Sequence, residues 1–174
     1  MTLSPIKILL ISLVCVFSFG QVNYLSPIFS HVFSFPNSRW DFMMDQEKYG
    51  VEIAGFLKGT NWETSPVIIY SEVIYSNYYF DLYNTLMVSK KTTQYKTIRH
   101  RQKQLLLDTK IPYTITFWVL PNIVFEYVTY FSIDKNHIVS IVMSSKNRKH
   151  IEKHFNDYKE ILRNFARTAS SLKK

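Results

Sequence analysis

The C-terminal segment of the chain carries the pattern that most limits its fold. Apolar residues recur there at spacings of four, three, four, three and four: Ile151, Phe155, Tyr158, Leu162, Phe165 and Ala169. This spacing places the apolar side chains in one stripe along an α-helix, and such a stripe must be buried against another element. The opposite side of the helix carries Lys149, Lys153, Arg163 and Arg167. We therefore expect a long amphipathic helix with one face in the core and a basic face in solvent.

Short runs rich in aromatic and β-branched residues precede this segment and predict a sheet for it to pack on. They cover residues 31–35, 40–44, 51–57, 67–75, 103–109, 113–120, 123–133 and 137–143. Between them, Phe80, Tyr83 and Met87 recur at helical spacing, which predicts a helix from Ser76 to about Ile98. Short connections in the second half favour an antiparallel meander. The expected fold class is α+β: an antiparallel sheet packed with an internal helix and a C-terminal amphipathic helix.

The first 20 residues are typical of a cleavable export signal. Lys7 precedes an apolar run from Ile8 to Phe19, and the small residues Ser18 and Gly20 stand where a signal peptidase cuts. The run is shorter than the roughly 20 residues that span a bilayer. We expect a mature chain that starts at Gln21, is periplasmic or secreted, and has no transmembrane span. The expected organisation is a signal peptide at 1–20, a lead-in segment at 21–30, one α+β domain at 31–170 and a basic tail at 171–174.

The single cysteine, Cys15, lies inside this apolar run. Val14 precedes it and the run continues beyond it, unlike a lipoprotein signal, in which the cysteine follows a small residue at the end of the run. The expected mature chain therefore has no disulfide, no thiolate nucleophile and no cysteine-ligated metal. A chain of this length can bury a core large enough to fold without them.

Positive charge is concentrated in two segments. Residues 89–110 hold seven basic and one acidic side chain, and residues 146–174 hold nine and three, so each segment has a net charge of +6. Such segments favour an anionic partner, and we expect an anionic protein, glycan or lipid surface. Nucleic acid is not the expected partner, because an exported protein rarely meets it. The candidate binding residues are Lys90, Lys91, Lys96, Arg99, Arg101, Lys103, Lys149, Lys153, Arg163 and Arg167. The alternative is that these cations are solvated and favoured only by a helix dipole.

His150 and His154 stand four residues apart on the predicted C-terminal helix and are the sharpest candidates for a metal site. A zinc protease of this type needs glutamate directly after the first histidine, whereas Glu152 stands two positions from each. Lys149 and Lys153 also crowd the pair with positive charge, which disfavours a dication. We expect the pair to belong to a solvated basic face, with no metal and no cofactor.

Catalytic motifs are few. No Gly-x-Ser-x-Gly elbow or phosphate-binding glycine loop occurs, and Gly55, inside a predicted strand, indicates a bulge or a close backbone approach. A pair of carboxylates could hydrolyse a glycosidic bond. The candidates between residues 41 and 52 are Asp41, Asp45, Glu47 and Glu52. Acids at a turn are usually solvated, so no catalytic residue is expected.

The segment 33–40, Phe-Ser-Phe-Pro-Asn-Ser-Arg-Trp, has an apolar strand, a proline, short polar residues and a tryptophan. Together with the order of the predicted elements, it resembles the start of PsbP-like α/β/α domains. That fold occurs in an extrinsic photosystem subunit, in a Ran-binding nuclear transport protein and in bacterial proteins of similar pattern. The resemblance implies a binding or accessory domain rather than an enzyme, and it carries over no catalytic residue.

Three functions follow from these observations. The favoured one is an exported non-catalytic binding or accessory domain with a basic surface for an anionic partner. The second is a cell-envelope hydrolase that uses carboxylates near residues 41–52. The third is a metal-binding protein that uses the histidine pair of the last helix.

Overall fold

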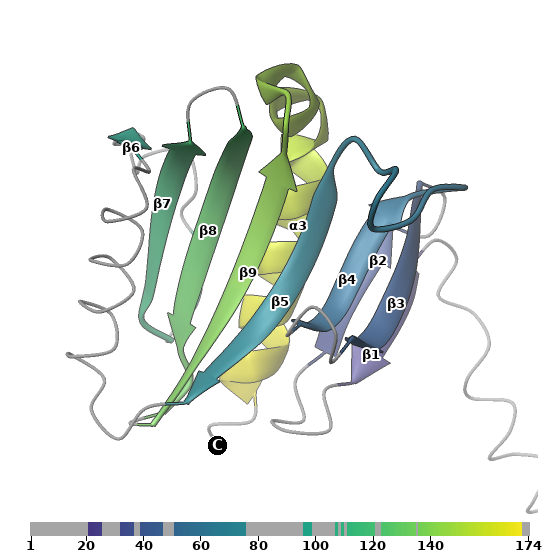
Figure 1. Ribbon diagram of the computed structural model, residues 1–174. Coiled ribbons are helices and arrows are strands. Elements are labelled where there is room, and N and C mark those ends of the chain that lie inside the picture. The colour runs from purple at the N-terminus through teal and green to yellow at the C-terminus, as the bar shows by residue number, and fades with distance from the viewer. Residues whose placement is uncertain are drawn as a thin grey trace, which may run out of the picture.

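The computed structural model describes residues 21–25, 32–36, 39–46, 51–75, 96–98, 107, 109, 111–120, 123–134 and 136–171 (Figure 1). Its elements are β1 (Gln21–Leu25), β2 (Val32–Pro36), β3 (Trp40–Gln46), β4 (Val51–Leu57), β5 (Ile68–Tyr75), β6 (Lys96–Ile98), β7 (Tyr113–Leu120), β8 (Val124–Ser132), β9 (His137–Ser145) and α3 (Arg148–Ser171). Strands β1 and β2 pair with each other. The others form a seven-stranded sheet in the order β3-β4-β5-β9-β8-β7-β6, and every described pairing is antiparallel.

The large sheet joins strands from the two halves of the sequence. Strands β7, β8 and β9 form a meander, with Phe131 of β8 opposite both Tyr113 of β7 and Val139 of β9. On its other side β9 pairs with β5 along the whole of β5, from Ile68 opposite Ser144 onward. The last strand of the sequence therefore lies in the middle of the sheet, where it is paired on both sides.

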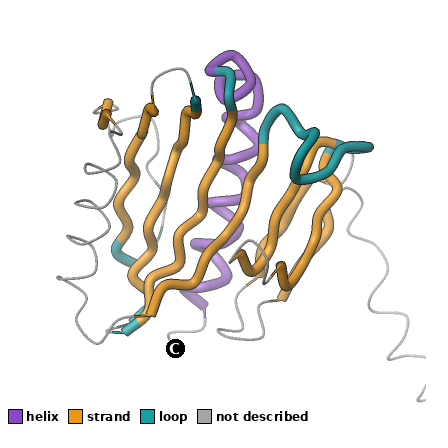
Figure 2. Tube along the Cα trace, viewed as in Figure 1, coloured by secondary structure: helices purple, strands orange, loops and turns teal. Residues whose placement is uncertain are grey.

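Helix α3 and the β1–β2 pair lie on the same side of the large sheet (Figures 1 and 2). The helix contacts β2, β9 and β8. It begins after Asn147, whose side-chain oxygen accepts the backbone N–H of Lys149 at 2.9 Å. This is the bond of an N-cap, which satisfies one of the free N–H groups of the first turn. The N-cap thus lies two residues after the end of β9, and the helix starts at the next residue, Arg148.

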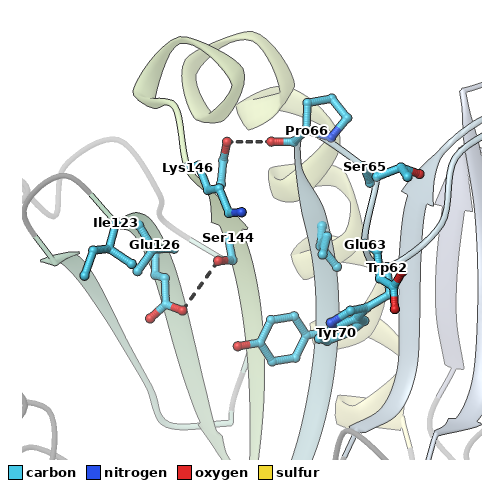
Figure 3. A pocket seen from close by; sticks show the side chains of 13 residues that line it. Trp62, Glu63, Ser65, Pro66, Tyr70, Ile123, Glu126, Ser144 and Lys146 are labelled. Atoms are coloured by element: carbon cyan, nitrogen blue, oxygen red, sulfur yellow. Dashed lines mark hydrogen bonds between the residues drawn. The ribbon is translucent and has the colours of Figure 1, made fainter.

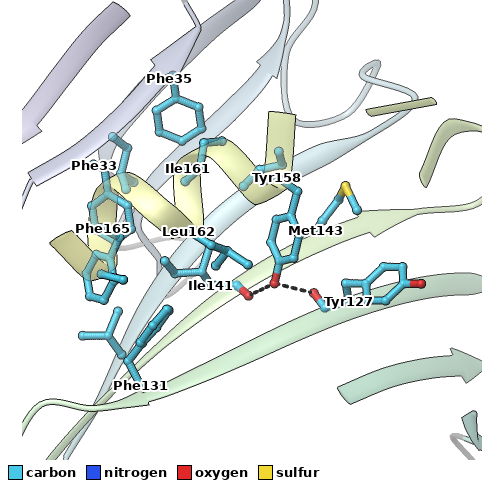
Figure 4. Close-up of a cluster of buried hydrophobic side chains, with 14 of the residues drawn as sticks. Phe33, Phe35, Tyr127, Phe131, Ile141, Met143, Tyr158, Ile161, Leu162 and Phe165 are labelled. Carbon is cyan, nitrogen blue, oxygen red and sulfur yellow. Dashed lines mark hydrogen bonds between the residues drawn. The ribbon is translucent and has the colours of Figure 1, made fainter. Parts of the chain in front are cut away.

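The core between α3 and the sheet is largely aromatic (Figure 4). The ring of Phe165 stacks on Phe33 of β2, with centroids 5.2 Å apart, and lies 4.7 Å from the ring of Phe131. The hydroxyl of Tyr158 donates to the carbonyl oxygen of Ile141 at 2.7 Å and lies 2.8 Å from Thr129 Oγ1. Burial raises the pKa of Tyr158, so its hydroxyl stays protonated and able to donate. The stripe predicted from sequence thus contributes both apolar contact and a satisfied polar group to the core.

The opposite side of the sheet also buries apolar side chains: Trp118, Val128, Tyr130, Ile138 and Val142 form one cluster. Along β8, Tyr127 and Phe131 belong to the core under α3, whereas Val128 and Tyr130 belong to this second cluster. Successive residues of a strand point to opposite faces. Because both faces of these strands bury apolar side chains, apolar residues follow one another along the strands instead of alternating with polar ones.

The structure confirms the predicted fold class in its sheet and C-terminal helix and corrects several local expectations. The predicted internal helix lies outside the described residues except at its end, where Lys96–Ile98 is strand β6 and not helix. Leu107 and Thr109 are not in the strand expected at 103–109. No strand is predicted in the lead-in segment, yet Gln21–Leu25 forms β1. The reason is that its backbone pairs with β2, although its own residues show no strand pattern. The expected signal peptide and residues 172–174 lie outside the described residues.

The ring of Phe35 lies very close to the backbone of Gly55, as the presence of a glycine inside a strand predicts. A Cβ atom at this residue would come within 2.8 Å of Cδ1 of Phe35, and closer still to Cε1 of the same ring. Phe35 is itself buried and packs between Trp40 and Phe42, with ring centroids 6.5 Å away in each case. The ring therefore has little space into which it can move.

We expect Gly55→Ala to lower the free energy of unfolding by about 1–3 kcal/mol, because an added methyl group overpacks the core. Urea titration followed by circular dichroism measures this change. Gly59→Ala is a useful comparison because no atom lies within 4 Å of its Cβ position, although its φ of 78° adds backbone strain. A Gly55→Ala protein as stable as the wild type would show that the Phe35 ring moves freely.

Candidate functional site

The outward side of α3 carries the four basic residues predicted there. Lys149, Lys153, Arg163 and Arg167 are all exposed, and we call this set the basic face. The span from the first to the last is about 27 Å at about 1.5 Å per residue. Glu160 lies on the same side at helical spacing and is partly buried. The basic face is therefore an extended, mostly cationic row on a helix whose other side is held in the core.

The first basic segment is described only in part. Lys96 begins β6, which lies at the end of the sheet order and is separated from β8 by β7. Helix α3 contacts β8, β9 and β2. The other five candidates of that segment, Lys90, Lys91, Arg99, Arg101 and Lys103, lie outside the described residues. The described residues therefore do not show the first basic segment next to the basic face of α3.

The histidine pair is split between two environments. His154 is buried, with 6% of its surface exposed, and its Nδ1 lies 3.4 Å from Asp157 Oδ2. His150 is half-buried at the start of the helix. The expectation that both belong to a solvated face is therefore wrong for His154, which faces the core because it shares a side of the helix with Tyr158. In the described part of the chain, no three His, Cys, Asp or Glu side chains come together to hold a metal ion.

Asp157 joins α3 to the start of β3. Its Oδ2 accepts the indole N–H of Trp40 at 3.1 Å, and its Oδ1 accepts from Arg39 Nη2 at 2.5 Å. Trp40 is fully buried, and its ring meets the His154 ring edge-on at 5.7 Å. We call Arg39, Trp40, His154 and Asp157 the Asp157 cluster. No pattern in the sequence indicates this cluster, because its two halves lie more than 110 residues apart.

The acids between residues 41 and 52 do not form a catalytic pair among the side chains that are described. Asp41 is exposed, and its Oδ2 accepts the backbone N–H of Gly59 at 2.8 Å. Asp41 pairs with Phe56 across the strands, and Glu52 lies four residues from Phe56 along β4. The backbone positions of Asp41 and Glu52 are therefore about 13 Å apart along the strands, at about 3.3 Å per residue. The two carboxyl groups of a glycosidase are closer together, at roughly 5–9.5 Å.

Glu52 lies in β4, where a strand is predicted, and not in the turn. It is buried, with 9% of its surface exposed, unlike the solvated acids typical of a turn. The physical reason is its position within β4, on the same face of the sheet as the buried Ala54. The side chain of Asp45 and the whole of Glu47 lie outside what the structure describes.

A cleft of about 800 Å³ opens at one end of the large sheet (Figure 3). Trp62, in the β4–β5 connection, and Tyr70 of β5 form one wall, and Glu126 and Ile123 lie opposite. Ser144 of β9 lies between the walls and donates a hydrogen bond of 3.5 Å to Glu126 Oε1. We call this the Trp62 cleft. No sequence motif indicated it, because its residues come from three separate parts of the chain.

Comparison with known proteins identifies the fold. No protein-family model matches the chain, and no curated protein matches it. The solution structure of cyanobacterial PsbP (CyanoP) from Synechocystis sp. PCC 6803 superimposes with a TM-score of 0.57 at 11% sequence identity, covering 86% of this chain and 94% of that one. The fold is PsbP-like. This confirms the resemblance predicted from the element order, and at this level of identity the likeness concerns the fold alone.

The PsbP-like architecture gives the opening segment 33–40 a physical role. Phe33 and Phe35 enter the core, and Trp40 at the end of the segment bonds to Asp157 of the last helix. The segment therefore links the first strands to α3. Among the described residues, no helix combines the length and apolar character needed to cross a membrane.

Proposed function

We propose that this chain is an exported, non-catalytic binding or accessory domain that docks on an anionic partner through the basic face of α3. The observation that carries the proposal is the exposure of Lys149, Lys153, Arg163 and Arg167 along one side of a helix. Export is supported by the apolar run after Lys7. A binding role agrees with what the PsbP-like resemblance implies.

Two features favour a docking role over simple solvation of these cations. The helix is held by core residues such as Phe165 and Leu162, both with no exposed surface, so its charges are presented in a fixed arrangement. The basic residues also begin in the first turn and none lies in the last turn, whereas a helix dipole favours cations only in the last turn. Lys149 in the first turn is placed against the dipole and needs another explanation, which an anionic partner supplies.

Charge reversal on α3 tests the proposal. Vesicles containing phosphatidylglycerol and immobilised heparin serve as lipid and glycan probes, and co-sedimentation and surface plasmon resonance measure binding to them. A basic side chain near an anionic surface contributes about 1 kcal/mol, so Lys153→Glu is expected to weaken binding by about fivefold or more. Arg163→Glu combined with Arg167→Glu is expected to weaken it further. Raising the salt from 0.1 M to 1 M shortens the Debye length from about 10 Å to about 3 Å and is also expected to weaken binding.

Lys58→Glu is the matched control for Lys153→Glu. Lys58 is exposed in the β4–β5 connection and does not belong to α3, and its reversal changes the net charge by the same amount. Both substitutions are expected to change the free energy of unfolding by less than about 0.5 kcal/mol. Equal effects of the two reversals on binding, or binding to neither probe at low salt, would contradict a role for the basic face.

A further inference from the structure

We propose that the Trp62 cleft is a second binding site, which accepts a lysine or arginine side chain of a partner polypeptide. The cleft lies on the side of the sheet opposite α3, because its residues Tyr70, Glu126 and Ser144 alternate in their strands with residues that face the helix. It is therefore separate from the basic face, and the proposal does not depend on the docking role of α3.

The aromatic wall of the cleft suits a cation with an alkyl chain. The rings of Trp62 and Tyr70 are half-buried, with centroids 5.6 Å apart and planes tilted by 53°. The buried Phe56 also meets Trp62 edge-on, with ring centroids 6.2 Å apart, so the indole packs against the interior of the fold. Two tilted rings form a corner, and a cation beside such faces gains a cation–π interaction. A sugar ring would instead stack on a single flat face.

The charge of the cleft supports the same ligand. Among the described residues that line it, Glu126 and Glu63 supply two carboxylates against the single cation of Lys146, although the whole chain has a net charge of +8. Glu126 is the buried one, with 6% of its surface exposed, and it accepts a hydrogen bond from Ser144. A carboxylate that is partly removed from water attracts a cation more strongly than one in bulk solvent, and its hydrogen bonds to guanidinium or ammonium groups are charge-assisted.

The size of the cleft favours a polypeptide over a free amine. At about 800 Å³ it exceeds what one basic side chain fills, so neighbouring residues of the partner would also enter. Ile123 at the rim is 56% exposed and offers them an apolar contact. Tryptophan and tyrosine at such a site are also the residue types that contribute most to protein–protein binding.

The test uses a fluorescein-labelled peptide of alternating alanine and arginine, and the same peptide with citrulline in place of arginine. Citrulline has nearly the shape of arginine but no charge. Fluorescence anisotropy with the full chain is expected to show binding of the arginine peptide, and binding of the citrulline peptide at least about tenfold weaker. Trp62→Ala and Glu63→Gln are each expected to weaken arginine-peptide binding by about threefold to tenfold.

Glu152→Gln is the matched control for Glu63→Gln. Both glutamates are exposed and both changes remove one negative charge, but Glu152 lies on α3. Circular dichroism checks that Trp62→Ala is folded, and Glu63→Gln, at an exposed position, tests the site without disturbing the aromatic wall. Equal binding of the two peptides, equal effects of the two glutamine variants, or no binding at about 1 mM peptide would overturn the proposal. Saturable binding of maltohexaose or chitohexaose without the arginine peptide would assign the cleft to a glycan instead.

Discussion

Replacing Phe165 by alanine is expected to lower the free energy of unfolding by about 3–5 kcal/mol. The side chain has no exposed surface, and its ring touches both Phe33 of β2 and Phe131 of β8. Its removal leaves a cavity between the helix, the β1–β2 pair and the sheet. These surroundings belong to three separate elements, so they cannot close the space by a small shift of one of them.

Urea titration followed by the circular dichroism of the helix measures the loss, and Ile123→Ala provides the comparison at an exposed apolar position. Ile123 is 56% exposed, so its truncation is expected to change stability by less than about 0.5 kcal/mol. A loss below about 1 kcal/mol for Phe165→Ala would mean that α3 does not pack on β2 as described.

The elements whose patterns are strong could be predicted from sequence alone. The ranges 51–57 and 113–120 match β4 and β7 at both ends. The C-terminal helix is also found where its apolar spacing places it, with Ile151, Tyr158 and Leu162 buried. In these cases a local preference and the long-range packing agree, so the pattern alone is sufficient.

The elements that depend on distant partners could not be predicted in this way. Strand β1 has no clear period and exists as a strand through its pairing with β2. Strand β6 has only three residues, each paired with β7, within a segment whose spacing favours a helix. A pairing partner can override local propensity in such short segments.

The candidate sites divide in the same way. The basic face could be predicted, because Lys149, Lys153 and their neighbours recur on one side of a single helix. The Trp62 cleft could not, because the β4–β5 connection, β8 and β9 meet only after the sheet has formed. His154 belongs partly to both groups. It stands four residues before Tyr158 of the apolar stripe, so helical spacing already places it on the buried side, but its contact with the distant Trp40 is not contained in any local pattern.

The Asp157 cluster leads to the second large expected effect. Asp157→Ala is expected to lower the free energy of unfolding by about 2–4 kcal/mol, because the buried indole N–H of Trp40 loses its acceptor. Arg39 contributes less, since 58% of its side chain is exposed and water can solvate it.

Asp157→Asn keeps an acceptor for Trp40 but loses the charge that Arg39 pairs with, so a loss of about 1 kcal/mol is expected, similar to that of Arg39→Gln. Urea titration of the three variants, with near-ultraviolet circular dichroism to report on Trp40, gives the order of effects. If Asp157→Ala costs no more than Arg39→Gln, the bond to Trp40 does not hold α3 to β3, and the helix is held by its apolar stripe alone.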